Sequence, residues 1–251
     1  MYAVERQKKI IEELSLKGSI SVNDLSTDLG VTVETIRRDL EKLEKLEQLT
    51  RTHGGAVLFE GRTPDLPSTK RSGMNIDGKI EIAKKAIMHI HSGDTVFLDG
   101  STTSYYLARL IKEVKNISVI TNSLQIIKEL SGCDTIKLIA IGGIFDINDE
   151  SFVGKIAADD ASHYCANKVF FSSKGVSKSK GILESNEAAY QIKKIMINNS
   201  TTKFLLIDKS KIDKIGFIKL ADFSDIDVFI TDTILSEEWQ EILEANDIEL
   251  L

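Results

Sequence analysis

The chain has 251 residues, 42% of them hydrophobic and 28% charged, which is enough for two globular domains with apolar cores. Its net charge of -6 excludes a protein that is basic throughout, so any nucleic-acid binding must come from a local patch. No stretch approaches the ~18 apolar residues of a membrane span, and the N-terminal segment carries charges where a signal peptide needs an apolar core. Cys133 and Cys165 lack metal-ligand spacing. We expect a reduced, cytoplasmic protein with no metal site, no cofactor and no membrane contact.

Helical patterns come first, and two of them cover residues 22–29 and 33–46. The turn between them is tight, and Thr32 is the expected N-cap of the second. Hydrophobic residues spaced three and four apart give this helix one buried stripe, which leaves Arg37 and Arg38 on its other faces. Two short helices in this arrangement are typical of a helix-turn-helix, whose second helix enters the major groove of DNA.

The residues after these helices predict two short strands around Gly54 and Gly55. Such a β wing would place Arg51 and His53 beside the phosphate backbone of DNA. The alternative is a helical module for dimerisation or docking, and the near balance of acidic and basic residues over 1–58 favours it. The agreement of cap, turn and strand signals over the whole segment favours DNA binding.

Both prolines of the chain fall in residues 59–76, where no regular hydrophobic period persists. We expect this segment to link an N-terminal domain of residues 1–58 to a C-terminal domain of residues 77–251. In the C-terminal domain, strand-like apolar runs alternate with helical patterns. This alternation predicts an α/β domain with a mostly parallel sheet that helices cover on both faces.

Polar residues and glycines follow the predicted strands of the C-terminal domain. Ligands bind at this edge of open parallel sheets, and a helix N-terminus there attracts anions such as phosphate. Each turn alone could be a capped turn, and for two of the residues, Asn122 and Ser123, that explanation is as good as a binding role. Together they predict one pocket, formed by Asp99, Gly100, Ser101, Thr102, Thr103, Thr121, Asn122, Ser123, Gly142, Gly143, Lys174, Gly175, Asp208 and Lys211.

The N-terminal segment resembles the winged helix-turn-helix of the DeoR family of bacterial transcriptional regulators, most specifically in "TIRRDL" and "HGGA". The second half resembles that family's effector domain in "LDGSTT", "VITNSL", "IGG" and "DKSK", which implies a fold similar to sugar-phosphate isomerases. The resemblance adds Lys79 and Glu187 to the effector site. It implies a DNA-binding surface made of Ser21, Thr32, Thr35, Arg37, Arg38, Lys42, Arg51, His53 and Gly54.

The sequence departs from the family pattern at two places. Glu47 stands where the family usually has Gly at the end of the recognition helix, and Gly100-Ser101 stands where members commonly read Ser-Gly. Glycine adopts left-handed backbone at little cost, whereas Glu and Ser do not. We therefore expect a different join between the recognition helix and the wing, and a different shape of the phosphate loop.

The resemblance implies a transcriptional regulator, namely a repressor of a carbohydrate-metabolism operon that a phosphorylated sugar releases from double-stranded operator DNA. Symmetric half-sites imply a homo-oligomer, a dimer or a tetramer. The alternative is a sugar-phosphate isomerase-like enzyme, because Asp99, Asp208, Lys211 and Glu187 supply the base and the cation that such a reaction needs. The attached DNA-binding domain favours a sensor over an enzyme, since it makes a bound metabolite a signal.

Overall fold

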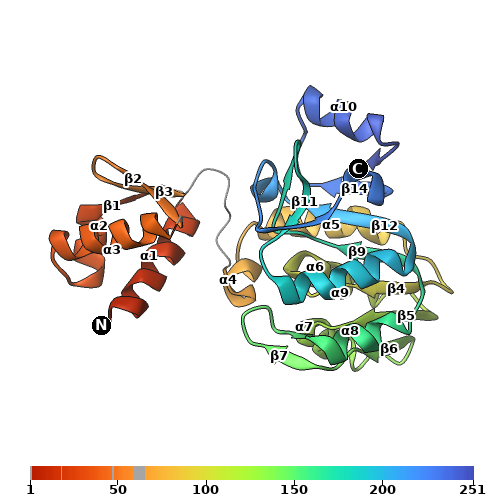
Figure 1. The fold of residues 1–251 in the computed structure, drawn as a ribbon. Helices are drawn as coiled ribbons and strands as arrows, with labels where there is room; N and C mark the ends of the chain where they lie inside the picture. Colours follow the sequence, from red (N-terminus) through yellow and green to blue (C-terminus); the bar gives the residue numbers. More distant parts are fainter. Residues whose placement is uncertain (1, 18, 47, 59–65) are drawn as a thin grey trace. The chain divides into compact units, whose positions relative to one another are not determined.

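The computed structural model describes residues 2–17, 19–46, 48–58 and 66–251. The chain divides into two compact units, Met1–Leu66 and Pro67–Leu251, each with an apolar core of its own (Figure 1). Glu47, one of the two departures from the family pattern, lies outside the described residues. The different join between the recognition helix and the wing that we expect from it therefore stays a prediction. Within the described ranges, no helix has the length and apolar character to cross a membrane.

The first unit has the winged helix-turn-helix architecture that the sequence predicts. Its helices pack with a three-stranded antiparallel sheet of order β1-β3-β2, and the turn between β2 and β3 forms the wing. The short strand β1 had no signal in the sequence. In chain order, the elements are α1 (Ala3–Lys17), β1 (Ser19–Ser21), α2 (Val22–Leu29), α3 (Val33–Lys45), β2 (Leu49–Thr52) and β3 (Gly55–Leu58).

Capping residues set the turn between α2 and α3. The Thr32 hydroxyl accepts a hydrogen bond from the Thr35 backbone N–H at 3.2 Å, as an N-cap does. At the start of α2, the Ser21 hydroxyl accepts from Asn23 N–H in the same way. Gly30 ends α2 with φ 63°, a left-handed conformation that glycine adopts at little cost. Capping residues that can be recognised in the sequence therefore determine the turn that joins α2 to α3.

A close backbone approach attaches the wing to the rest of the unit. A Cβ atom at Gly55 would lie 1.8 Å from the carbonyl oxygen of Ile20, so glycine is required where β3 passes β1. Gly54 has open space at the corresponding position and is exposed at the turn. Of the Gly-Gly pair, Gly55 therefore meets the packing constraint and Gly54 stays accessible.

A buried ion pair ties α1 to α3. Arg6 Nε lies 2.5 Å from Asp39 Oδ2, and Gln7 Nε2 donates to the other carboxylate oxygen at 2.8 Å. The Asp39 side chain is only 4% exposed. Because an unpaired carboxylate is costly inside a protein, the pair holds α3 in one orientation on α1.

The second unit contains the remaining elements. Its helices are α4 (Ser68–Ser72), α5 (Ile76–Ile87), α6 (Thr102–Ile111), α7 (Leu124–Leu130), α8 (Lys155–Ser162), α9 (Glu187–Asn198) and α10 (Glu237–Ala245), with short 3-10 turns at Lys209–Lys211 and Phe223–Asp225. Its strands are β4 (Thr95–Leu98), β5 (Ile117–Thr121), β6 (Ile136–Ala140), β7 (Ile144–Asp146), β8 (Ser151–Val153), β9 (Ala166–Phe171), β10 (Gly175–Ser177), β11 (Gly181–Glu184), β12 (Ser200–Ile207), β13 (Ile218–Ala221), β14 (Val228–Thr231) and β15 (Glu249–Leu250).

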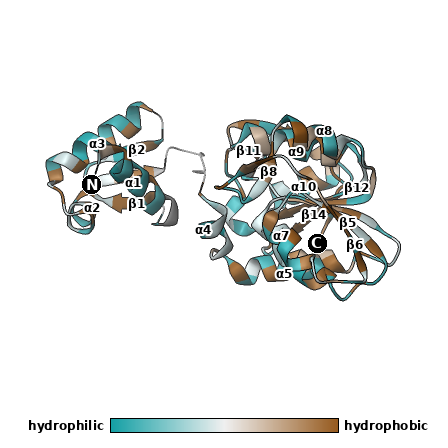
Figure 2. Cartoon of the chain, turned by 90° about the horizontal axis from the view of Figure 1, so that it is seen from below, coloured by the Kyte–Doolittle hydropathy of each residue, from teal (hydrophilic) through white to brown (hydrophobic). Residues whose placement is uncertain are grey.

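A seven-stranded parallel sheet of order β15-β14-β12-β9-β4-β5-β6 forms the centre of this unit. Successive residues of its strands face opposite sides, so Phe97 packs in the core with α8, α9 and α10, whereas Val96 and Leu98 pack in the core with α5, α6 and α7. Figure 2 shows the result, with largely apolar strands between helices that carry both polar and apolar residues. The predicted α/β class and mostly parallel sheet are confirmed.

Two parts of the second unit differ from the sequence prediction. The predicted linker of residues 59–76 includes α4 and the first residue of α5, which belong to the second unit. In addition, the antiparallel hairpin β7–β8 and the small sheet β10-β11-β13 lie outside the parallel sheet. These short strands of three or four residues lack a readable period, and both additions contribute to the pocket described below.

Candidate functional site

The exposed face of α3 carries the basic residues predicted to contact DNA. Arg37, Arg38 and Lys42 are all exposed. Arg38 Nε lies 3.6 Å from Glu34 Oε1, but its side chain is 76% exposed, and an ion pair of this kind contributes little. Arg38 is therefore available to a partner, as a residue that reads a base or a phosphate must be.

The wing holds its predicted residues in different ways. His53 and Gly54 are exposed in the turn between β2 and β3. Arg51 Nε lies 2.7 Å from Glu44 Oε2, and the Arg51 backbone N–H donates to the same carboxylate at 3.0 Å. This carboxylate connects β2 to the end of α3. The hydroxyls of Ser21 and Thr32 serve as helix caps, so any contact of these two residues with DNA would come in addition to that use.

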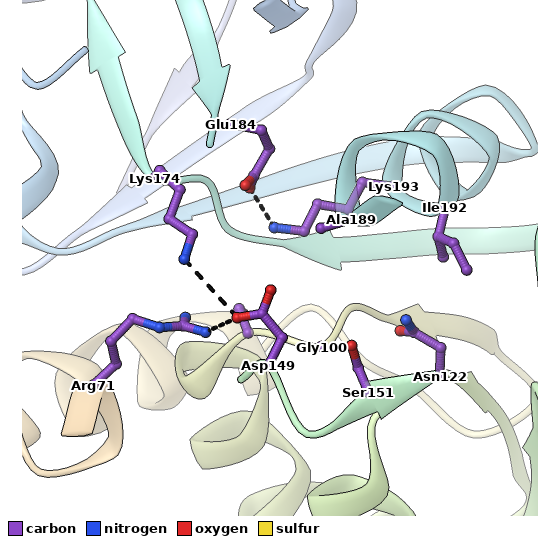
Figure 3. A pocket seen from close by; sticks show the side chains of 11 residues that line it. Arg71, Gly100, Asn122, Asp149, Ser151, Lys174, Glu184, Ala189, Ile192 and Lys193 are labelled. Atoms are coloured by element: carbon purple, nitrogen blue, oxygen red, sulfur yellow. Dashed lines mark hydrogen bonds and ion pairs between the residues drawn. The ribbon is translucent and has the colours of Figure 1, made fainter. Parts of the chain in front are cut away.

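A pocket in the second unit lies where the loop before α6 meets α4, α9 and the β7–β8 hairpin (Figure 3). Its volume is about 20 Å³, room for one or two water molecules. The lining residues come from seven segments that are far apart in the sequence. They are Arg71, Gly100, Ser101, Asn122, Asp149, Ser151, Lys174, Glu184, Ala189, Ile192 and Lys193.

Asp99 lies under the pocket at the end of β4 and is fully buried. Its Oδ1 accepts from the hydroxyls of Ser101 at 2.6 Å and Ser104 at 2.5 Å, and its Oδ2 accepts from the Ser172 backbone N–H at 3.1 Å. Burial alone would raise the pKa of Asp99, but the Lys193 ammonium and these donors outweigh it and lower the pKa. Asp99 is therefore an ionised residue that shapes the loop before α6.

Lys193 on α9 joins two buried carboxylates. Its Nζ lies 2.5 Å from Glu184 Oε1 and 3.2 Å from Asp99 Oδ2, and it donates to the Ser172 carbonyl at 2.7 Å. Burial would lower the pKa of Lys193, but Glu184 and Asp99 outweigh it and raise the pKa. Sequence reasoning identified neither Lys193 nor Glu184, which is completely buried at the end of β11.

A second group of charged residues also lines the pocket. Arg71 of α4 and Lys174, after β9, both point at Asp149 in the tip of the β7–β8 hairpin (Figure 3). Arg71 Nη2 pairs directly with Asp149 Oδ1, and Lys174 Nζ lies 3.9 Å from the same oxygen. The pocket thus combines three cations with carboxylates that already form ion pairs with them.

Asn122 presents an oxygen without a partner. Its Nδ2 donates to the Phe152 carbonyl at 2.9 Å, which fixes the direction of the amide. The Asn122 Oδ1 is buried, and among the described residues no hydrogen-bond donor reaches it. Gly100 keeps the space beside it open, because a Cβ atom there would lie 3.1 Å from Ser151 Cβ. A buried acceptor of this kind suits a ligand hydroxyl or amine.

Two family models match the chain. Residues 6–62 match the DeoR-like helix-turn-helix domain, and residues 74–233 match the DeoR C terminal sensor domain. The chain belongs to the DeoR family. It is a DNA-binding transcriptional regulator with a sensor domain, as the resemblance of its motifs implied.

Relatives of similar length match this DeoR-family chain almost from end to end. The uncharacterized HTH-type transcriptional regulator YulB of Bacillus subtilis is 38% identical, with 100% of this chain and 96% of the relative covered. The L-fucose operon activator of Haemophilus influenzae is 36% identical, with 97% of each covered. The lactose phosphotransferase system repressor of Lactococcus lactis is 34% identical, with 93% and 92% covered. Among solved structures, ribose 5-phosphate isomerase A of Methanocaldococcus jannaschii has a TM-score of 0.41 at 17% identity, covering 55% of each chain.

Some of the predicted effector residues of this DeoR-family chain line the pocket. They are Gly100, Ser101, Asn122 and Lys174. Thr102 and Thr103 form the first turn of α6, where helix N–H groups lack partners within the helix, but their side chains are buried and lie outside the lining. Ser101 has φ -79° and caps α6 through Ser104 N–H, so the Gly-Ser order does not strain this loop. Neither residue has a positive φ, and a shape of this loop different from that of other family members stays a prediction.

The other predicted effector residues serve packing or lie beside the pocket. Thr121 and Ser123 are buried at the end of β5, and the Ser123 hydroxyl caps α7. Gly142 is exposed. Gly143 and Gly175 permit close packing, because a Cβ atom would meet Ala157 and Val153 in the first case and the Lys214 backbone in the second.

The two residues that the resemblance added are not in the lining. Lys79 Nζ donates to the carbonyls of Arg71 and Met74, so it holds the end of α4 in place. Glu187 is exposed in the first turn of α9, and the buried carboxylate nearby is Glu184. Lys79 and Glu187 are therefore not among the lining residues, and a role for them in effector binding stays a prediction.

Asp208 and Lys211 form a neighbouring cluster. Lys211 Nζ donates to the Ser172 hydroxyl at 2.7 Å and lies 3.9 Å from Asp208 Oδ2. The pKa of Lys211 is lowered to about 8, and burial is the main cause. The positive charges of Arg71, Lys193 and Lys79 lower it as well, whereas the Asp208 carboxylate raises it. The shared Ser172 connects this cluster to Lys193, whose Nζ binds the Ser172 carbonyl.

The lowered pKa of Lys211 predicts a specific pH dependence of stability. Below about pH 8 the lysine is charged in both the folded and the unfolded chain, and the folded state carries the cost of burying that charge. Between pH 8 and about 10.4 the folded state loses the proton first, so the free energy of unfolding should rise with pH.

Denaturant titrations of the parent chain and of Lys211→Met at pH 7.5, 8.5 and 9.5 measure this effect. The difference in unfolding free energy between the two proteins isolates Lys211 from other titrating groups. It should shift in favour of the parent chain as pH rises. A difference that stays constant over this range would show that Lys211 has an ordinary pKa.

Proposed function

We propose that this DeoR-family regulator represses an operon of carbohydrate metabolism and leaves its double-stranded operator when a phosphorylated sugar binds in the pocket of the second unit. The relatives named L-fucose operon activator and lactose phosphotransferase system repressor support the class of target. The observation that carries the effector is the cluster of three cations, Arg71, Lys174 and Lys193, around Gly100 and the N-cap of α6. Cations at a helix N-terminus recognise phosphate groups.

The sugar part of the effector would bind through hydrogen bonds. Asn122 Oδ1 is a buried acceptor that a sugar hydroxyl can satisfy, and Ser151 lies beside it in the lining. A site built to hydrogen-bond a hydroxyl discriminates strongly against analogues that lack it. Asn122 is thus our candidate for the residue that distinguishes a sugar phosphate from free phosphate.

The carboxylates of this unit support a sensor rather than an isomerase. A catalytic base must reach a carbon-bound proton. Asp99 is buried under the loop and accepts from two hydroxyls and a backbone N–H, while Asp208 accepts from the Ser210 backbone N–H outside the pocket lining. Glu184 in the lining pairs with Lys193. These carboxylates are engaged in structural contacts, so we propose that the protein has no isomerase activity.

Replacement of Arg38 should weaken DNA binding and leave the first unit folded, because the side chain is exposed on α3. Binding sites are first selected from random double-stranded DNA with the full chain. Arg38→Ala should then bind the selected site about 1 to 3 kcal/mol more weakly if Arg38 reads a base. Lys9→Ala on α1 removes a charge from another exposed position and is the control. Equal affinities for the two variants would exclude Arg38 from the DNA-binding surface.

Effector binding can be found by a thermal-shift screen of the full chain against phosphorylated sugars. A ligand at ~100 times its Kd stabilises the folded protein by ~2.7 kcal/mol. Lys174→Met should weaken binding of the hit by about 10- to 100-fold, since a hydrogen bond to a charged group contributes about 1.5 to 3 kcal/mol. Lys178→Met is the control, because Lys178 pairs with Glu238 away from the pocket lining. Unchanged affinity in Lys174→Met would refute the assigned phosphate site.

We also propose a homo-oligomer, a dimer or a tetramer, because one winged helix-turn-helix contacts too little DNA for specificity and paired half-sites need paired units. Exposed isoleucines on the second unit offer apolar surface for association, with Ile147 76% and Ile156 70% exposed. Sedimentation velocity of the full chain at micromolar concentration should give the mass of a dimer or larger assembly. A monomer under these conditions would contradict the proposal.

A further inference from the structure

The β7–β8 hairpin places a carboxylate where a phosphate would bind. Resting on the proposed function, we infer that Asp149 is an internal competitor for the effector's phosphate group: it occupies Arg71 and Lys174 in the closed pocket, and a phosphate monoester that takes over these cations displaces the tip of the hairpin from α4. The sequence placed neither Asp149 nor Arg71 in the site.

The contacts of Asp149 are those that an anionic ligand would make. Arg71 and Lys174 approach the same Asp149 Oδ1 from different segments, α4 and the loop after β9 (Figure 3). All three side chains are largely buried, with exposures of 17%, 8% and 10%. Two buried cations directed at one carboxylate oxygen form a site for an anion with more than one charge.

The size of the pocket requires a movement. A volume of about 20 Å³ admits a water molecule but not a phosphate group with a sugar attached. The hairpin tip, residues 147–150, belongs to no helix and to no strand. Glu150, next to Asp149, has φ 47°, which a non-glycine residue keeps only when its surroundings hold it there. The tip can therefore move without breaking a helix or a strand.

The charges in and under the pocket also require a displacement. Among the described residues, Arg71 and Lys174 pair with Asp149, and Lys193 pairs with Glu184 and Asp99. A phosphate monoester carries nearly two negative charges at neutral pH. Its entry beside a retained Asp149 would place like charges together in a buried site, whereas exchange with Asp149 removes one of them. Phosphate and Asp149 are therefore alternatives.

The same tip also holds α4. Ser68 N–H donates to the Asn148 carbonyl at 2.6 Å, the Ser68 hydroxyl donates to Glu150 Oε2 at 2.7 Å, and Arg71 pairs with Asp149. Helix α4 begins one residue after Pro67, the first residue of the second unit. An anion that displaces Asp149 thus changes contacts of the helix that follows directly on the connection to the DNA-binding unit. This gives the effector a physical route to the start of the second unit.

The test compares Asp149→Asn with Glu150→Gln in the full chain. Both variants remove one negative charge from the tip and keep the shape of the side chain, but Glu150 accepts from the uncharged Ser68 and Gln125. Isothermal titration with inorganic phosphate in a chloride buffer should show binding to Asp149→Asn at least tenfold tighter than to the parent chain. Glu150→Gln should bind like the parent.

The outcomes separate this inference from the proposed function. If the parent chain binds phosphate and Asp149→Asn binds equally or more weakly, the competitor role is wrong and the phosphate site remains. If no chain binds phosphate and the sugar-phosphate screen finds no ligand, both fail together.

A second measurement does not depend on any variant. Hydrogen exchange of the parent chain should show that phosphate increases the exchange of amides in residues 147–152 and in α4, because the tip leaves α4. Slower or unchanged exchange in both segments would overturn the inference even if phosphate binds.

Discussion

The pocket depends on one buried cation. Lys193 lies between Asp99 and Glu184, both completely buried, and its ammonium group pairs with both carboxylates. Without it, Asp99 would no longer be held ionised to accept from Ser101 and Ser104 in the loop before α6. Removal of one partner of a buried ion pair leaves an uncompensated charge, which typically costs 3 to 5 kcal/mol. The loop, the end of β11 and α9 are therefore held together electrostatically before any ligand arrives.

The charged residues in and under the pocket form two groups with different roles. The Asp99–Lys193–Glu184 group has its bonding capacity largely filled within the protein, by contacts of 2.5 to 3.2 Å and by a backbone carbonyl. The Arg71–Asp149–Lys174 group is built on a short helix and a hairpin, with one of its contacts as long as 3.9 Å. A sensor needs both groups. The fixed group positions the ligand, and a contact that the ligand can replace changes when the ligand binds.

The parts that sequence analysis predicted are those encoded by neighbouring residues. Thr32, Ser101 and Ser123 cap the helices that follow them, and the polar ends of β4 and β5 meet at one edge because the strands are parallel. Arg71 and Asp149 were missed because they are 78 residues apart and lie on elements too short for a hydrophobic period. Arg71 was also concealed by its place in a proline-containing segment that reads as a linker.

Residues transferred by resemblance lie outside the pocket lining, as do most of those predicted from strand ends. Lys79 and Glu187 are in the second unit as expected, but Lys79 holds backbone carbonyls of residues 71 and 74 and Glu187 is exposed. A motif gives the position of a residue in the chain, whereas the direction of its side chain depends on the packing around it. Lys193 and Glu184 show the converse, because their roles come from burial that no motif expressed.

The buried Arg6–Asp39 pair has a consequence for the dissociation of the protein from DNA by salt. Contacts between exposed cations and DNA phosphates weaken steeply as ionic strength rises, because the counterions that binding releases become more concentrated. Exposed ion pairs of the protein are screened under the same conditions, but a pair whose side chains are 11% and 4% exposed is screened much less. Concentrated salt can therefore dissociate the first unit from DNA while the ion pair keeps α1 and α3 packed together. The folded unit can then bind DNA again when the salt is diluted.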